Sequence, residues 1–346
     1  MILAGGQGTR LRPLTLARAK PVVPLLNRPF LAYQLSLLRQ HGVTDVILSC
    51  SYRVEDVEAA LGDGRGLGVH LRYVVEKEPL GTGGGVRNAA DLTSGSMFVL
   101  NGDVLTDVDL TAMRGVHEAR GSRTTIYLAP VEDPRAYGLV ETDAAGRIER
   151  FREKPGADEA ITTNLINAGV YLLDATLLQR MPADRPVSIE REFFPALIAD
   201  GVPCFGWAPV TYWRDIGNPA AYLAAQLDLL QERVKTPLIP RGERHHGSWI
   251  APGTTVPPGV SVVGPSLIGS HVTLGAGSRI GPLAVIGDGC AIASHARIER
   301  SVLWERVQVG SDAVIQDAVI GSDARIRSNA TVAPNTVLES GANFPA

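Results

Sequence analysis

The chain has 346 residues, more than one ordinary hydrophobic core accommodates, so two domains are expected. Its formal net charge of -3 and its pI of about 6.2 exclude a bulk attraction to nucleic acid or to an anionic membrane. It shows neither a basic segment followed by a long apolar run nor an apolar stretch that could span a bilayer, so we expect a cytoplasmic protein.

The first predicted element is a short apolar strand at residues 1–3, which runs into a glycine-rich turn. Glycines let backbone N–H groups approach an anion closely, and a concavity lined by such groups binds phosphate. Arg10 and Lys20 add positive charge. A P-loop needs Lys and then Ser or Thr after its last glycine, and a dinucleotide fingerprint needs Gly or Ala where this chain has Leu11, so both are excluded. The alternative is a plain surface loop.

This run, followed by Lys20 and Pro21, resembles the signature of the sugar-phosphate nucleotidyltransferases. The resemblance implies a Rossmann-like α/β catalytic domain in which the glycine segment wraps a nucleoside triphosphate. It also implies that Lys20 lies against the reacting phosphates. The residues expected to hold the triphosphate are Ala4, Gly5, Gly6, Gly8, Thr9 and Arg10.

Helices and strands alternate after this motif. Helices are expected at residues 29–41, 54–61 and 84–92, and strands at residues 43–49, 69–75 and 97–100. Short buried strands that alternate with helices predict βαβ units and a mostly parallel sheet. Ligands of such sheets bind beyond the carboxyl ends of the strands. The glycine turn and residues 101–103 both follow strands, so we expect them at that edge.

Residues 76–85 also follow a strand and precede a helix, and four of them are glycine. Glycines allow the backbone to lie against a flat ligand, and the family resemblance places the nucleobase of the NTP here. The expected contacts are Glu78, Leu80, Gly81 and Thr82. The alternative is a flexible strand-to-helix turn.

Asp103 directly follows a buried strand, where a carboxylate is well placed to hold Mg²⁺. The alternative is a turn or N-cap aspartate, and Asp107 and Asp109 in the same loop are interpreted as solvated or capping. The resemblance makes Asp215 the second ligand of Mg²⁺, the expected cofactor. Asp215 could instead cap the helix expected at residues 219–233.

A strand at residues 124–130 leads to a hairpin that carries Gly138 and ends in Glu153 and Lys154. By resemblance, Glu153 accepts hydrogen bonds from sugar hydroxyls and Lys154 neutralises the phosphate of a sugar 1-phosphate. The expected sugar-phosphate contacts are Asn101, Gly102, Gly138, Glu153, Lys154 and Asn167. Ser188 is expected to cap a helix, and Glu190 and Glu192 are interpreted as structural charges in its first turn.

The catalytic domain is expected to span residues 1–233, followed by a polar linker at residues 234–249. From Ile250, aliphatic residues recur every six positions, which predicts a left-handed parallel β-helix of about five coils over residues 250–346. The repeat runs through Val256, Val262, Ile268, Leu274, Ile280, Ile286, Ile292, Ile298 and Trp304, slips by one, and resumes through Val309, Ile315, Ile320, Ile326, Val332 and Leu338. Open solenoid ends favour a homo-oligomer formed through the β-helix.

The chain is most similar to the branch of the family that joins GTP to mannose 1-phosphate, on the runs at residues 167–171 and 188–195. Three alternatives stay open: transfer of thymidylyl, uridylyl or adenylyl groups to glucose 1-phosphate, a non-catalytic nucleotide-sensing partner, and a bifunctional acyltransferase using His271 or His295. The chemistry implied by the resemblance is in-line attack of the sugar phosphate at the α-phosphorus, with release of pyrophosphate. Positioning and electrostatics would supply the catalysis.

Overall fold

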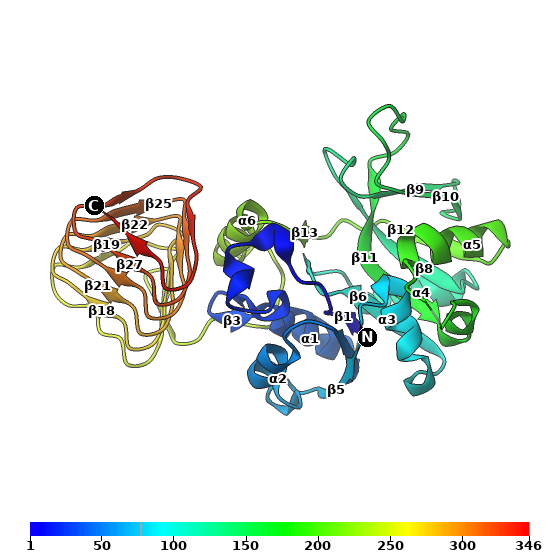
Figure 1. The fold of residues 1–346 in the computed structure, drawn as a ribbon, viewed down its shortest axis with the longest axis horizontal. Helices are drawn as coiled ribbons and strands as arrows, with labels where there is room; N and C mark the ends of the chain where they lie inside the picture. Colours follow the sequence, from blue (N-terminus) through cyan, green and yellow to red (C-terminus); the bar gives the residue numbers. More distant parts are fainter. Residues whose placement is uncertain (77, 184, 346) are drawn as a thin grey trace. The chain divides into compact units, whose positions relative to one another are not determined.

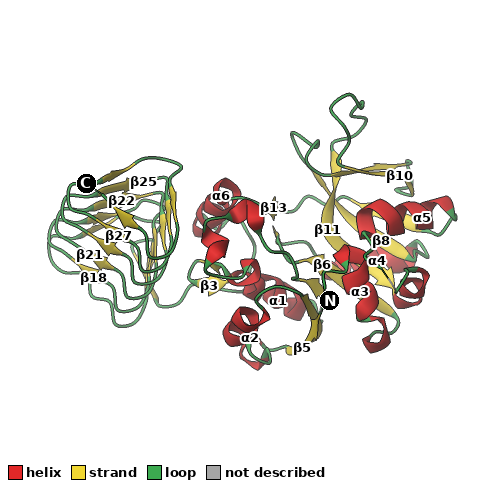
Figure 2. Ribbon diagram, viewed as in Figure 1, coloured by secondary structure: helices red, strands yellow, loops and turns green. Residues whose placement is uncertain are grey.

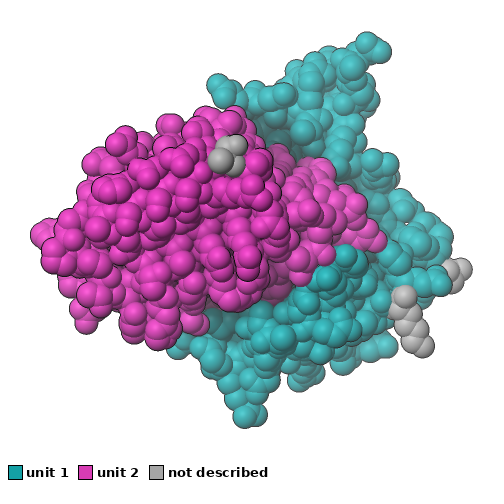
Figure 3. Space-filling model, turned by 60° about the vertical axis from the view of Figure 1, so that its left-hand side comes forward, with its two compact units in different colours: residues 1–6, 37–213 teal, residues 7–36, 214–346 magenta. Residues whose placement is uncertain are grey.

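The computed structural model describes residues 1–76, 78–183 and 185–345, and the chain folds as two compact units. One unit comprises residues 1–6 and 37–213, and the other comprises residues 7–36 and 214–346 (Figure 3). The segment that carries Gly8, Arg10 and Lys20 therefore belongs to the same unit as the C-terminal repeat.

The first unit is built around a nine-stranded sheet (Figure 1). Its strands are β1 (Ile2–Leu3), β4 (Asp45–Cys50), β5 (His70–Val75), β6 (Ser96–Asn101), β8 (Thr124–Pro130), β9 (Gly138–Thr142), β10 (Ile148–Glu153), β11 (Leu165–Asp174) and β12 (Cys204–Trp207). Strands β6, β1, β4 and β5 are parallel neighbours, which confirms the predicted βαβ arrangement. Strand β11 is antiparallel to β6 and β8, and the antiparallel pair β9 and β10 extends the sheet beyond it.

The helices of this unit are drawn in Figure 2; three of the regions correspond to predicted helices, those at 54–61, at 84–92 and after Ser188, while the helix at Leu110–Ala119 was not predicted. They are α2 (Val54–Leu61), α3 (Gly81–Asn88), α4 (Leu110–Ala119) and α5 (Phe194–Ala199), with a π-helix, η7 (Ile189–Phe193), directly before α5. Short 3₁₀ turns, η4 (Arg65–Leu67), η5 (Ala90–Leu92) and η6 (Ala175–Arg180), lie between them. The helix predicted at residues 84–92 begins earlier, at Gly81, and gives way to the η5 turn. Ser188 caps η7 as predicted, because its hydroxyl accepts a hydrogen bond from the N–H of Arg191.

The core of the first unit lies where the sheet meets α3, η7 and α5. Tyr171, Phe193 and Phe194 pack there as an aromatic cluster, with the ring centroids of Tyr171 and Phe194 5.0 Å apart. Cys204 is buried in the same core, and Cys50, Cys204 and Cys290 are all free and buried. No helix in the described part of the chain is long and apolar enough to cross a membrane.

The second unit begins with three 3₁₀ turns and a small hairpin. They are η1 (Thr9–Leu11), η2 (Leu14–Leu16), η3 (Lys20–Val22), β2 (Pro24–Leu25) and β3 (Arg28–Pro29). Helix α1 (Phe30–Gln40) leads out of this segment and ends before Gly42, whose φ of 75° suits a glycine cap. Strand β13 (Trp213–Asp215) precedes α6 (Pro219–Leu230), whereas β7 (Val104–Thr106) precedes α4 in the first unit.

The remainder of the second unit is a parallel β-helix with three faces (Figures 1 and 2). One face contains β14 (Glu243–His245), β15 (Ser248–Ile250), β17 (Leu267–Ile268), β20 (Val285–Ile286), β23 (Val302–Leu303), β26 (Val319–Ile320) and β29 (Val337–Leu338). A second contains β16 (Ser261–Val262), β19 (Arg279–Ile280), β22 (Arg297–Glu299), β25 (Val314–Gln316) and β28 (Thr331–Val332). The third contains β18 (Thr273–Leu274), β21 (Ala291–Ile292), β24 (Gln308–Val309), β27 (Arg325–Ile326) and β30 (Asn343–Phe344).

The predicted six-residue period matches the inward-facing positions up to Ile298, and then one assignment is wrong. The period predicted Trp304 at the next inward position, but Leu303 occupies the core and Trp304 is absent from it. The shortened step falls in the corner after Ile298, where Arg300 has a φ of 47° and the Ser301 hydroxyl donates to the Glu299 carbonyl at 2.7 Å. This tight corner brings Leu303 inward and frees Trp304 for another contact.

Candidate active site

The ends of β1 and β6 bring two predicted motifs to one edge of the sheet. Leu3 and Asn101 are directly paired in the parallel register, so the segments that follow both strands start side by side. The Gly102 N–H donates to the Leu3 carbonyl at 2.9 Å, and a Cβ on Gly102 would lie only 2.5 Å from that oxygen. Only glycine fits this crossing, which sets the half-buried Asp103 in the turn beyond the strand.

Beside this turn, a bulge in β11 gathers polar side chains. The pairing of β11 with β8 is interrupted between Asn167 and Tyr171, where Gly169 has a φ of 74°. The Asn167 amide donates to the Tyr171 hydroxyl at 2.9 Å, and the Asn101 side chain also bonds to this hydroxyl. Burial, and after it the charge of Glu190, raise the pKa of Tyr171 well above its ordinary value. Asn101 and Asn167, two predicted sugar-phosphate contacts, therefore lie close together. The hydroxyl of Tyr171, which was not among the predicted site residues, lies between them.

The next group lies on the hairpin of β9 and β10. Gly138 pairs directly with Glu153, and a Cβ on Gly138 would lie 2.6 Å from the Glu153 carboxylate. The glycine therefore leaves the space that the Glu153 side chain occupies. Lys154 follows with a φ of 49°, an uncommon conformation for a non-glycine residue, and its ammonium lies 3.6 Å from Glu153. All three predicted sugar-phosphate contacts of this hairpin are thus neighbours.

Glu153 is mostly buried, with 15 % of its side chain exposed, and its environment disfavours the charged form. Burial raises its pKa, and the nearby carboxylate of Glu190 raises it further, while Lys154 and Arg191 act in the opposite direction. The net pKa of Glu153 is above its ordinary value. A carboxylate held in this way is ready to accept hydrogen bonds from a polar ligand.

The structure places Glu190 in the first turn of η7, as predicted, and gives its carboxylate partners both within and beyond that helix. Its carboxylate accepts hydrogen bonds from Thr82 at 2.7 Å and from Ser188 at 2.9 Å. The π-helix turns Glu190 toward Glu153, which no local pattern in the sequence indicated. Glu192, in contrast, accepts from the Ser188 N–H at 3.1 Å and stays a structural residue, as predicted.

The expected base-binding turn precedes and begins α3. Glu76 closes it, because its carboxylate accepts from the Leu80 N–H at 3.0 Å and from the Ser49 hydroxyl at 2.7 Å. Gly81 has a φ of 73° and faces the Val187 carbonyl, which accepts from the Gly83 N–H at 2.8 Å. Hydrogen bonds therefore hold the turn at Leu80 and at the start of α3. Glu78 is exposed on this turn. Glu76, which was not among the predicted contacts, stabilises the turn through its hydrogen bonds.

The other half of the predicted machinery lies in the second unit. Gly8 has a φ of 63°, and a Cβ there would lie 2.9 Å from the Cβ of Lys20 and 3.1 Å from the methyl group of Thr15. The Thr15 hydroxyl donates to the Gly8 carbonyl at 2.8 Å. The loop therefore folds back so that the buried Lys20 lies directly beneath Gly8. Its exposed members include Gln7, Thr9 and Arg10.

Arg10 faces Asp215 within this unit, with 3.9 Å between guanidinium nitrogen and carboxylate oxygen. A Cβ on Gly217 would lie 2.7 Å from that carboxylate and 3.0 Å from the guanidinium, so a larger residue there would displace one of the two side chains. The alternative role of Asp215 as a helix cap is wrong. Asn218 caps α6, since its side chain accepts from the Ala221 N–H at 2.9 Å.

The two other aspartates that follow Asp103 have structural partners. Asp109 caps α4, because its carboxylate accepts from the Ala112 N–H at 2.9 Å. Asp107 accepts from the Tyr212 N–H at 2.8 Å. The interpretation of Asp109 as a capping residue is confirmed. Asp103 is therefore the candidate metal ligand of this loop.

The carboxylates of Asp103 and Asp215 are the kind of ligand that Mg²⁺ binds, and they do not form the set of three or more protein ligands that a metal held only by the protein needs. Among residues 1–76, 78–183 and 185–345, no three His, Cys, Asp or Glu side chains cluster closely enough to hold a metal ion. Mg²⁺ keeps several waters and usually binds through one or two carboxylates and the phosphates of a substrate. Asp103 and Asp215 offer such carboxylates, one in each unit.

Comparison with known families gives two matches along the chain. The model described as "Nucleotidyl transferase" matches residues 1–232, and the model described as "GMPPB C-terminal domain" matches residues 262–344. The first covers the residues of the candidate site, and the second covers most of the β-helix.

Relatives match nearly the whole chain. A Mannose-1-phosphate guanylyltransferase of Mycobacterium tuberculosis (strain ATCC 25618 / H37Rv) is 40% identical over 87% of this chain and 82% of its own length. A UTP--glucose-1-phosphate uridylyltransferase of Synechocystis sp. is 31% identical over 92% of this chain and 86% of its own length. Among solved structures, HddC from Yersinia pseudotuberculosis complexed with GMP-PN is 29% identical, with a TM-score of 0.56, over 66% of this chain and 97% of its own.

Proposed function

Because this chain belongs to the nucleotidyl transferase family, we propose that it joins GTP and mannose 1-phosphate to form GDP-mannose and pyrophosphate. The family assignment supports the class of reaction, a nucleotidyl transfer to a sugar 1-phosphate. The choice of GTP and mannose is supported by the 40% identity over 87% of the chain to a relative named Mannose-1-phosphate guanylyltransferase.

The proposed reaction forms one bond and breaks one. An oxygen of the sugar phosphate attacks the α-phosphorus of GTP, and the bond from that phosphorus to the oxygen bridging to the β-phosphorus breaks. The electron pair leaves with pyrophosphate. No covalent enzyme intermediate is required, so the protein contributes position and charge stabilisation.

The sugar phosphate is assigned to the first unit. Lys154 would neutralise its phosphate, and the neighbouring Glu153 would accept hydrogen bonds from sugar hydroxyls. Their separation of 3.6 Å and the space left over Gly138 support this pairing of roles. Asn101 and Asn167 can donate further hydrogen bonds from the adjacent bulge.

The triphosphate is assigned to the loop that contains Gly8. Backbone N–H groups of its exposed residues and the guanidinium of Arg10 would hold the β- and γ-phosphates, and Lys20 would lie near the phosphates that react. The fold of this loop over Lys20 supports the assignment. Mg²⁺, when bound by Asp103 and Asp215, would neutralise charge on the phosphate groups.

The bases and sugars in the relatives' names differ. A uridylyltransferase of glucose 1-phosphate is 31% identical over 92% of this chain, so similar sequences serve other bases and sugars. The solved structure of HddC is described as a complex with GMP-PN, and this similarity supports the choice of GTP for this chain. The closed turn between Glu76 and Gly81 is where we expect the base to be selected.

A substrate matrix tests both levels of the proposal. Purified protein is incubated with Mg²⁺ and each of GTP, ATP, UTP, CTP and dTTP, against mannose 1-phosphate and glucose 1-phosphate, and pyrophosphate release is measured. We expect the highest kcat/KM for GTP with mannose 1-phosphate. A higher value for another pair replaces the substrates but keeps the class. No release with any pair rejects the enzyme in favour of a non-catalytic nucleotide-sensing partner.

A further inference from the structure

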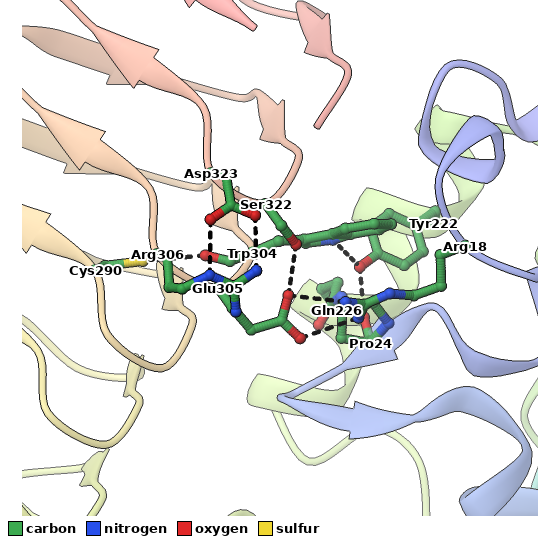
Figure 4. Close-up of polar contacts among 10 residues, drawn as sticks. All are labelled: Arg18, Pro24, Tyr222, Gln226, Cys290, Trp304, Glu305, Arg306, Ser322 and Asp323. Carbon is green, nitrogen blue, oxygen red and sulfur yellow. Dashed lines mark hydrogen bonds and ion pairs between the residues drawn. The ribbon is translucent and has the colours of Figure 1, made fainter. Parts of the chain in front are cut away.

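Trp304 connects the β-helix to the segment that carries the triphosphate loop, and both belong to the second unit (Figure 4). Only 1% of Trp304 is exposed, and a buried indole N–H needs an acceptor. It donates to the Tyr222 hydroxyl at 2.9 Å, and Tyr222 in turn donates to the Pro24 carbonyl. The Gln226 amide donates to the same carbonyl at 2.7 Å. The β-helix and α6 therefore hold Pro24 together.

Glu305, the next residue, holds the same segment at a second point. Its two carboxylate oxygens accept from the two terminal nitrogens of Arg18 at 3.0 and 3.1 Å. Ser322 donates to the same carboxylate at 2.6 Å, and the Arg18 guanidinium lies 5.0 Å from the centre of the Trp304 ring. Both side chains of the ion pair are 28% exposed. A bidentate, partly buried pair that is also stacked on an aromatic ring fixes Arg18 far better than an exposed pair would.

A third contact follows a few residues later. The Asn27 side chain donates to the Ile286 carbonyl of the β-helix at 2.8 Å, and the neighbouring Leu26 N–H donates to Gln226 at 2.8 Å. Residues 18–27 are thus attached to the β-helix and α6 along their length.

These attachments lie immediately beside the residues assigned to the triphosphate. Arg18 stands between Thr15 and Lys20, the two residues that contact Gly8. Gln7, Thr9 and Arg10 are exposed, so their position depends on the buried residues that follow them, among them Leu11, Leu14, Thr15 and Lys20. A displacement of Arg18 would move Thr15 and Lys20, and with them the turn at Gly8.

We propose that Trp304 and Glu305 are positioning residues for the triphosphate-binding loop, so that the β-helix sets the nucleotide affinity of the enzyme. This inference rests on the proposed function for the identity of the ligand. In this proposal the two side chains act within a single chain, whereas a role in self-association would require a second copy. It predicts that weakening these contacts impairs NTP binding and leaves sugar phosphate binding intact.

The β-helix offers a matched control. Arg306 and Asp323 form a bidentate ion pair at 2.7 Å on the same coils, with side chains 61% and 52% exposed, and both residues belong to the β-helix. Asp323→Asn removes a pair of the same type without touching the loop segment. Glu305→Gln removes the charge that holds Arg18 and keeps the size of the side chain.

We expect Glu305→Gln to raise the KM for GTP about tenfold, the effect of losing one charge-assisted contact. The KM for mannose 1-phosphate should stay within about twofold, because Glu153 and Lys154 are in the other unit. Asp323→Asn should change neither value. Arg18→Lys, which keeps the cation but not the two-pronged geometry, should give an intermediate KM for GTP.

Hydrogen exchange supplies a readout that needs no catalysis. Peptides covering residues 8–20 should exchange faster in Glu305→Gln than in the unaltered protein or in Asp323→Asn. Trp304→Phe, which removes the N–H but keeps a ring, should have the same effect and serves if Glu305→Gln does not fold. Equal KM values and equal exchange in the Glu305 and Asp323 variants overturn the proposal. If the unaltered protein releases no pyrophosphate, the proposed function fails, and exchange alone decides whether Trp304 and Glu305 position the loop.

Discussion

Arg10 and Asp215, from opposite ends of the catalytic sequence, face each other across 3.9 Å in the second unit. The pair is loose, since 66% of the Arg10 side chain is exposed while only 17% of Asp215 is. A loose pair suits residues that must exchange partners when an anion and a cation bind, because little interaction energy is lost on separation. The proposed function assigns Arg10 to phosphate and Asp215 to Mg²⁺, and this exchange can be tested.

Asp215→Asn should lower kcat by at least about a hundredfold and leave the stability of α6 unchanged, because it removes a proposed metal ligand and not the helix cap. Asn218→Ala is the matched control. It removes the observed cap and should lower the free energy of unfolding by about 1 kcal/mol with little loss of kcat. Pyrophosphate release and chemical denaturation measure both effects, and equal kcat values in the two variants would contradict the assignment of Asp215.

Gly217→Ala should lower kcat/KM, because the added methyl group would lie 2.7 Å from the Asp215 carboxylate and 3.0 Å from the Arg10 guanidinium. One of the two side chains must move. Gly115→Ala is the control, since nothing lies within 4 Å of a Cβ there and the residue is inside α4. That change should stabilise the protein by up to about 1 kcal/mol with unaltered kinetics. Normal kinetics in the Gly217 variant would exclude a role for the pair.

Asp103→Asn should reduce kcat by at least about a hundredfold with a nearly unchanged melting temperature, because the residue lies in a turn and is proposed to bind Mg²⁺. Asp109→Ala removes the cap of α4 and should show the reverse, a loss of about 1 kcal/mol in unfolding free energy with normal turnover. The dependence of rate on Mg²⁺ concentration is the decisive measurement. If the Asp103 variant saturates at the same Mg²⁺ concentration and rate as the unaltered protein, Asp103 is not a ligand.

Glu153→Gln should raise the melting temperature at neutral pH while raising the KM for the sugar 1-phosphate tenfold or more, as expected for a lost contact to a charged acceptor. The pKa of Glu153 lies above its ordinary value through burial and Glu190, so the folded state holds the proton more tightly than the unfolded chain does. The stability linked to this proton is present below the ordinary pKa and is lost as pH rises through the folded pKa.

The stabilising effect of Glu153→Gln should therefore grow as pH rises through this range and then level off. Glu149→Gln, at an exposed position of the same strand, is the control and should change neither stability nor KM. Melting curves at several pH values and steady-state kinetics give the comparison. A Glu153 variant that is less stable than the unaltered protein at neutral pH would refute the like-charge contact with Glu190.

Much of the fold follows from the sequence because the signals involved are local. The six-residue aliphatic period, the helix at Val54–Leu61 and the cap at Ser188 each depend on residues a few positions apart, and each is found in the structure. The glycine turn after the first strand and the segment at residues 101–103 were both predicted at the carboxyl edge of the sheet, and Leu3 and Asn101 are paired there. For the site, the sequence supplied residue types, and family resemblance supplied their roles.

What the tertiary structure decided were pairings between distant segments. Which of Asp215 and Asn218 caps α6, where the β-helix period shortens, and which way Glu190 turns all depend on packing that no short window of sequence contains. The same holds for the attachment of Arg18 to Glu305. A side chain's periodicity says which face of an element it occupies, but its partner is set by which other element reaches that face, and this is fixed only when the whole chain closes around its cores.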